Sequence, residues 1–168
     1  MAPLTYIVDG YNVLHALFPG VSRAELEDRR RWLIDQLAGF AALKGARVAL
    51  VFDAHGKSSP ACEPVPGTPL EVCYAGGGFT ADTLIARRIA EQPADATTVV
   101  VSADQEVQRT ASRAGVLRMT PRELGEEIGH FGQKLANHEK SSRIPSSLED
   151  KVDVETWRKL ERLRKQGT

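Results

Sequence analysis

Residues 6–9 (YIVD) set the interpretation of the whole chain, because a short apolar run ends there on an acidic residue. Such a run followed by Gly10 is typical of a buried strand that ends in a turn. A second apolar run, residues 48–52 (VALVF), ends in the same way on Asp53. Its hydrophobicity is continuous rather than alternating, which favours a strand covered on both faces, as in a parallel sheet.

Strand and helix patterns alternate outward from these two runs. Further strands are expected at residues 70–74, 98–101 and 116–119, and helices at residues 22–44, 81–92 and 105–114, with another beginning at Thr120 and Pro121. Residues 54–69 contain four prolines and predict a long irregular loop. Alternating strands and helices predict an α/β domain of three layers, with a central parallel sheet and helices on both faces.

Composition and charge limit the possible classes of protein. The 168 residues suit one domain over residues 1–132, followed by a polar linker and a basic C-terminal helix within residues 133–168. No apolar run is long enough to cross a membrane, and residue 1 leads directly into a strand pattern, so we expect a cytoplasmic protein. The net charge is zero, which gives no support to nucleic-acid binding through bulk charge. Cys62 and Cys73 are expected to be inert thiols rather than a disulfide.

Acidic residues follow several of the expected strands. Asp9, Asp53 and Asp104 come after three different strands, and Asp82 lies in the first turn of the helix that follows another. The carboxyl ends of parallel strands line one edge of a sheet, so these carboxylates should approach one crevice. Clustered carboxylates repel one another unless a cation neutralises them. The pattern therefore indicates a site for Mg²⁺ or Mn²⁺ that activates water against a phosphate ester.

Each of these residues also has a purely structural interpretation. An aspartate after a strand is often a turn residue or a helix cap. Asn12 can hold a metal-bound water or a phosphate, or cap a local turn, and Ser102 can bind a phosphate or only the backbone. Exposed cations are candidates for contacts with RNA phosphates, although helix-surface arginines are more often simply solvated: Arg30, Lys57, Arg87 and Arg88.

Three segments resemble the motifs of one family. Residues 6–14 (YIVDGYNVL) resemble the opening motif of the YacP-like NYN domains, relatives of the PIN nucleases, and residues 80–83 (TADT) and 100–105 (VVSADQ) resemble the second and third acidic motifs. The similarity covers about residues 4–132. It implies a PIN-like fold and metal-dependent endoribonuclease activity, with a catalytic centre of Asp9, Asn12, Asp82 and Asp104. The three aspartates would be metal ligands, whereas the resemblance does not extend to Asp53.

The resemblance also implies a substrate, and it leaves other functions open. YacP-like proteins are linked to ribosomes and messenger RNA decay, so RNA, including mRNA on the ribosome, is the expected partner. One alternative is a non-catalytic RNA- or ribosome-binding module of the same fold. Another is a phosphotransfer domain with Asp9 as the acceptor, but Tyr11 stands where such enzymes usually carry a second acid. The sequence does not give the oligomeric state.

Overall fold

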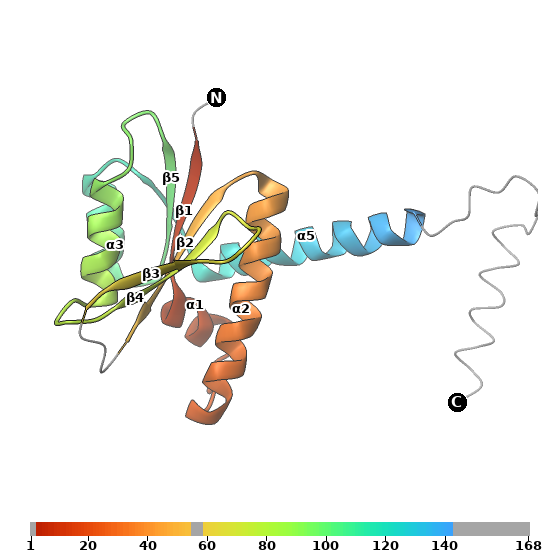
Figure 1. The fold of residues 1–168 in the computed structure, drawn as a ribbon, viewed down its shortest axis with the longest axis horizontal. Helices are drawn as coiled ribbons and strands as arrows, with labels where there is room; N and C mark the ends of the chain where they lie inside the picture. Colours follow the sequence, from red (N-terminus) through yellow and green to blue (C-terminus); the bar gives the residue numbers. More distant parts are fainter. Residues whose placement is uncertain (1–2, 55–58, 143–168) are drawn as a thin grey trace, which may run out of the picture. The chain divides into compact units, whose positions relative to one another are not determined.

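The computed structural model describes residues 3–54 and 59–142, which form an α/β fold around a six-stranded sheet (Figure 1). The chain divides into two compact units, Met1–Gln133 and Lys134–Thr168. The strand order is β3-β4-β2-β1-β5-β6. The strands are β1 (Leu4–Asp9), β2 (Arg47–Asp53), β3 (Ala61–Pro64), β4 (Leu70–Ala75), β5 (Thr97–Val101) and β6 (Leu117–Met119). All neighbours pair in parallel except β3 with β4, so the predicted fold class is confirmed.

The helices lie on both faces of the sheet. They are α1 (Gly10–Leu17), α2 (Arg23–Lys44), α3 (Ala81–Ala90), α4 (Gln105–Arg113) and α5 (Pro121–Ser142). In Figure 1, α3 covers one face of the sheet and α2 covers the other. Side chains of β1 point alternately to the two faces of the sheet. Tyr6 and Val8 belong to one buried cluster and Ile7 to the other, so each face of the sheet has its own core.

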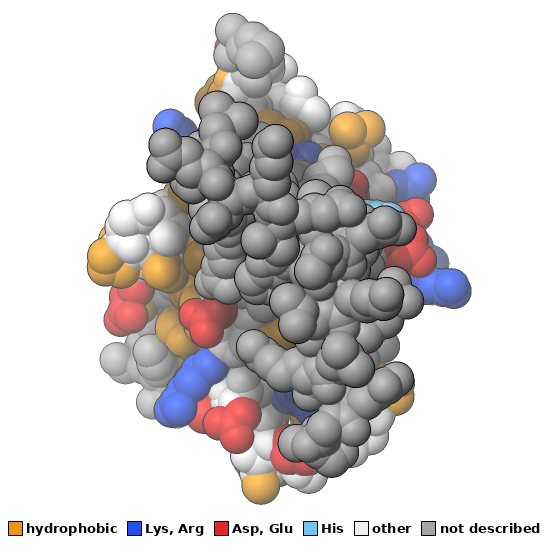
Figure 2. All heavy atoms as spheres, turned by 90° about the vertical axis from the view of Figure 1, so that its right-hand side faces the viewer, with side chains coloured by type: hydrophobic (Ala, Val, Ile, Leu, Met, Phe, Trp, Pro, Cys, Tyr) orange, Lys and Arg blue, Asp and Glu red, His pale blue; other side chains and the backbone are white. Residues whose placement is uncertain are grey.

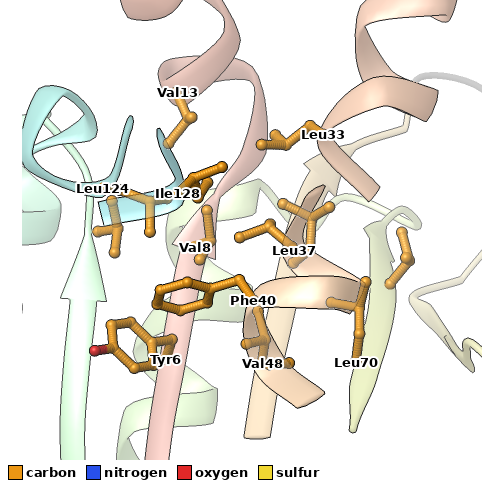
Figure 3. Close-up of a cluster of buried hydrophobic side chains, with 14 of the residues drawn as sticks. Tyr6, Val8, Val13, Leu33, Leu37, Phe40, Val48, Leu70, Leu124 and Ile128 are labelled. Carbon is orange, nitrogen blue, oxygen red and sulfur yellow. The ribbon is translucent and has the colours of Figure 1, made fainter. Parts of the chain in front are cut away.

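The larger buried cluster joins β1 to α1, α2 and the beginning of α5 (Figure 3). Leu33, Leu37 and Phe40 follow one another at helical spacing on α2 and are almost fully buried. Their helix has the expected boundaries: Ser22 and Glu25 form a reciprocal capping box, and Gly45 ends it with a φ of 64°. These contacts pack α2 against one face of the sheet.

Helix α1 was missed, because Asp9 followed by Gly10 was interpreted as a turn. The helix instead begins directly at Gly10. A Cβ atom at this position would overlap the ring of Phe52, so only glycine allows the chain to pass this close to β2. Gly10, which the sequence analysis interprets as a turn residue, is therefore needed for close packing between the start of α1 and β2.

The segment expected to be a long loop contains the edge strand β3. It pairs antiparallel with β4, with Cys62 directly opposite Cys73. The two cysteines form a disulfide, so the expectation of inert thiols was wrong. Strand pairing brings the two sulfur atoms together, and the sequence spacing alone does not show this.

The end of the described chain also differs from expectation. Helix α5 continues to Ser142, so the beginning of the expected polar linker is helical. The expected basic C-terminal helix lies outside the described residues. Within the described part of the chain, no helix is both long and apolar enough to cross a membrane.

Candidate metal centre

The order of the strands reverses at β1. The chain passes from β1 to β2 and β4 on one side, then returns to β5 on the other side of β1. In open α/β sheets, ligands bind where the strand order reverses in this way. Asp9 ends β1 and Asp104 follows β5, so both lie at this position.

Asp9 is a buried acid whose side chain does not cap a helix. It occupies the N-cap position of α1, yet its carboxylate makes no capping hydrogen bond. Only 8% of the residue is exposed, and its Oδ2 accepts a hydrogen bond of 2.9 Å from the Ser102 hydroxyl. The helix-cap interpretation therefore does not explain why an acid stands here.

Ser102 positions two of the aspartates. Its hydroxyl oxygen donates to Asp9 and accepts a 3.0 Å hydrogen bond from the backbone NH of Asp104. The residue is 1% exposed. The expectation that Ser102 contacts RNA is therefore corrected, because its hydroxyl is buried and bonded within the protein.

Asp104 and Asn12 hold the loop after β5 in place. Asp104 Oδ1 caps α4 by accepting from the backbone NH groups of Glu106 and Val107, at 2.8 and 3.2 Å. Asn12 Oδ1 accepts from the NH of Ala103 at 2.7 Å, which ties α1 to this loop. The Asn12 carbonyl oxygen is thus used in the fold, and its NH₂ group is the part that can reach a ligand.

Asp53 and Asp82 come from the end of β2 and the first turn of α3. Asp53 Oδ1 accepts a 2.6 Å hydrogen bond from the NH of Ala81 and so joins the end of β2 to the start of α3. Asp82, the next residue, is exposed in the first turn of α3. Both acids are therefore brought to the site by the beginning of one helix.

Asp9 and Asp82 are both affected by the charges of the other aspartates. Burial raises the pKa of Asp9 to about 6, the Ser102 hydrogen bond opposes this shift, and the charges of Asp82, Asp104 and Asp53 add to it. Burial also raises the pKa of Asp82, with contributions from Asp104, Asp53 and Glu106. Glu106 was missed as a fifth acid, although its place two residues after Asp104 could have suggested it.

Among residues 3–54 and 59–142, no basic side chain forms a salt bridge that neutralises this negative charge. None of the salt bridges among the described residues reaches the four aspartates. The N-termini of α1, α3 and α4 all begin beside these acids, and the partial positive charge of a helix N-terminus offsets part of the repulsion. The remaining charge favours a bound cation.

The available atoms suit a hard divalent cation. All the candidate ligands are carboxylate oxygens, the type that Mg²⁺ and Mn²⁺ prefer. Within the described residues, Asp9 Oδ1 and Asp104 Oδ2 accept no hydrogen bond, while the second oxygen of each carboxylate is fixed in position. The donor set therefore fits the expected metal.

The other candidate cations are placed differently. Arg88 lies at the far end of α3, where it pairs with Glu71 at 2.6 Å and donates to both sulfur atoms of the disulfide. It holds the edge hairpin, and its contact with RNA stays a prediction. Arg87 pairs with Glu91 at the same end of α3. Lys57 lies outside the described residues, and Arg30 lines a groove beside Asp53.

Cys62, Glu71 and Cys73 also gather potential ligand atoms, within 4.8 Å of one another. Their two sulfur atoms are already joined, and the Arg88 guanidinium occupies the space beside them. A positive side chain in this place opposes cation binding. The described residues therefore favour the aspartates as the metal centre.

Charges of both signs lie on the part of the surface that is coloured in Figure 2. Where side chains are coloured in Figure 2, Lys and Arg lie beside Asp and Glu. This agrees with the zero net charge of the chain.

Comparison with known proteins identifies relatives of this fold. The family model described as YacP-like NYN domain matches residues 6–165. The crystal structure of a tryptophan-to-leucine mutant of Rae1 (YacP) from Bacillus subtilis is similar with a TM-score of 0.68 and 26% identity, covering 86% of each chain. Another crystal structure of Rae1 (YacP) from Bacillus subtilis gives a TM-score of 0.64 and 25% identity, covering 98% of this chain and 95% of that one. No curated protein matches the sequence.

Proposed function

Because this chain belongs to the YacP-like NYN family, a family of PIN-like nucleases, we propose that it is a metal-dependent endoribonuclease that hydrolyses RNA phosphodiester bonds. The main support is the coupling of Asp9, Asp53, Asp82 and Asp104 at one edge of the sheet. An acid whose charge is destabilised first by burial and then by three other acids is costly for the fold, and a divalent cation offsets that cost. Such an arrangement is expected where a metal is needed for function.

The residues of the site have two proposed roles. The aspartates bind the metal, and Ser102 and Asn12 position a metal ligand, the phosphate or the attacking water. Asp9, Asp82 and Asp104 would hold Mg²⁺ or Mn²⁺, with Asp53 close enough to contribute charge. When bound, the ion supplies an activated water and stabilises negative charge on the phosphate. Ser102 fixes Asp9, and the amide NH₂ of Asn12 donates to a phosphate oxygen or to the attacking water.

The proposed substrate is RNA, including messenger RNA presented by a ribosome in the cytoplasm. Its basis is the family to which the chain belongs, together with the sequence motifs that resemble that family. A second candidate is a non-catalytic RNA- or ribosome-binding module. One observation favours this second candidate. Asp53 and Asp104 both accept hydrogen bonds from backbone NH groups at helix N-termini, so a structural role is enough to explain these two acids.

Cleavage assays separate the two functions. Wild type, Asp9→Asn and the exposed control Asp95→Asn are incubated with end-labelled single-stranded RNA and with ribosome-bound mRNA, in Mn²⁺ or in EDTA. We expect Mn²⁺-dependent cleavage by wild type and Asp95→Asn, and none by Asp9→Asn. Equal cleavage by Asp9→Asn would eliminate the proposed metal centre. Binding of RNA without cleavage of either substrate would favour the binding module.

A further inference from the structure

A groove lies beside the metal centre and has no role in the chemistry described above. Its volume is about 660 Å³, and it is lined in part by Tyr11, His15, Arg23, Arg30, Asp53 and Tyr74. We call this the aromatic groove. Asp53 is one of its walls and also acts electrostatically on Asp9 and Asp82. A ligand in the groove would therefore lie next to the metal ligands.

Helix α2 contributes cations to one side of the aromatic groove. Arg23, Leu26 and Arg30 all line it, and their spacing of three and four residues places them on the same helix face. Arg30 pairs with Glu27 through Nη2 at 2.7 Å, whereas its Nε is buried and has no hydrogen-bond partner among the described residues. The Arg30 side chain as a whole is about one-quarter exposed, so the rest of its guanidinium is accessible from the groove.

Aromatic rings form the adjoining wall. Phe52 is fully buried and lies between two tyrosines, with ring centroids 4.8 Å from Tyr11 and 6.1 Å from Tyr74. Both tyrosines are only partly buried and line the groove. The Arg30 guanidinium lies 5.5 Å from the Tyr74 ring centroid. Aromatic rings and guanidinium planes of this kind are the surfaces on which unpaired RNA bases stack.

We propose that the aromatic groove binds one unpaired RNA nucleotide next to the phosphate that is cleaved. This inference rests on the proposed function, because the metal centre decides which phosphate is cleaved. The groove itself is defined only by the residues that line it. The base stacks on the surface made by Tyr11, Tyr74 and Arg30, and Arg23 and the exposed part of the Arg30 guanidinium bind phosphate oxygens. A base inside a duplex is covered by its neighbours, so the groove selects single-stranded RNA.

Binding without metal tests the groove directly. Fluorescence anisotropy in EDTA measures the affinity of a labelled single-stranded RNA 12-mer and of the same sequence in a duplex. The variants are Arg30→Gln and Tyr74→Leu, and Arg31→Gln is the matched control because Arg31 is on the same helix but is largely exposed. Each groove variant should weaken single-strand binding about tenfold, as expected for loss of a stacking or phosphate contact. The control should change it less than threefold, and the duplex should bind more weakly than the single strand.

Abasic nucleotides then identify stacking. In wild type, removing the base at one position should weaken binding about tenfold, and in Tyr74→Leu the same removal should have no further effect. Tyr74→Phe should behave as wild type, which distinguishes lost stacking from a lost hydroxyl or a damaged fold. If the losses of affinity caused by Tyr74→Leu and by removal of the base were fully additive, or if all variants bound RNA equally well, the proposed nucleotide site would be refuted.

The outcomes also separate this inference from the proposed function. A protein that cleaves RNA in Mn²⁺ but binds it equally well after the groove substitutions lacks the nucleotide site and keeps the nuclease function. A protein that shows the groove effects in EDTA but cleaves neither free nor ribosome-bound RNA keeps the nucleotide site and loses the nuclease function.

Discussion

The side chains of Ser102 and Asp9, 93 residues apart in the sequence, form a 2.9 Å hydrogen bond that is buried at the end of the central strand. The bond joins β1 to the loop after β5, and the same hydroxyl accepts from the backbone of Asp104. Its electrostatic effect is to lower the pKa of Asp9, against the stronger effect of burial. Ser102 thus sets both the position and the charge of the central acid.

Replacing Ser102 with alanine should shift metal binding to higher pH. Without the hydroxyl, burial raises the pKa of Asp9 above about 6, so a higher pH is needed to ionise the metal ligand. Loss of a buried hydrogen bond should also lower the free energy of unfolding by about 1 kcal/mol. Calorimetric titration with Mn²⁺ between pH 5 and 8, both approximate limits chosen to bracket the titration of Asp9, measures the shift. The exposed control Ser112→Ala should match wild type, and an unshifted Ser102→Ala profile would refute this role.

Replacing Asp9 with asparagine should stabilise the metal-free protein at neutral pH. The folded-state pKa is about 6 and the ordinary value 3.8, so the cost of the charge is absent below about pH 4, develops as the pH rises to about 6 and is complete above it. A difference of about two pKa units corresponds to about 3 kcal/mol. Urea unfolding in EDTA should show this gain at neutral pH and almost none at about pH 4. A variant less stable than wild type at neutral pH would contradict the expected strain.

Replacing Gly10 with alanine should damage both fold and site. The new Cβ would overlap the ring of Phe52, which is fully buried and cannot move aside freely. Such overpacking typically costs about 1–3 kcal/mol, and displacement of Asp9 should weaken Mn²⁺ binding as well. Gly39→Ala is the control, because open space surrounds Gly39 in α2 and alanine favours helix. Chemical denaturation measures the free energy of unfolding of the two variants. Equal effects of the two substitutions would show that the packing at Gly10 is unimportant.

Most of the fold could be predicted because its signals are local. The apolar strands, the capping box at Ser22 and the helix end at Gly45 each depend on a few neighbouring residues. Helix α1 and strand β3 were missed for the opposite reason. The first depends on the contact of Gly10 with Phe52, and the second on pairing with β4 across a proline-rich segment.

From the sequence, only those residues of the site that directly follow a strand could be predicted. Positions after strands were sufficient to nominate Asp9, Asp53 and Asp104, which the parallel sheet brings to one edge. The tasks of individual side chains depend on partners far away in the sequence. The contact of Arg88 with the Cys62–Cys73 hairpin, for example, is visible only in the folded structure.

Mn²⁺ titration by calorimetry on wild type and Asp9→Asn/Asp82→Asn tests the metal centre without depending on the substrate. We expect wild type to bind Mn²⁺ and the double variant to give no heat above dilution, with Asp95→Asn as a control that binds normally. Carboxylates that repel one another when metal-free should gain stability from the ion, so Mn²⁺ should also raise the melting temperature of wild type alone. Equal Mn²⁺ binding by wild type and the double variant would contradict a metal centre built on these aspartates.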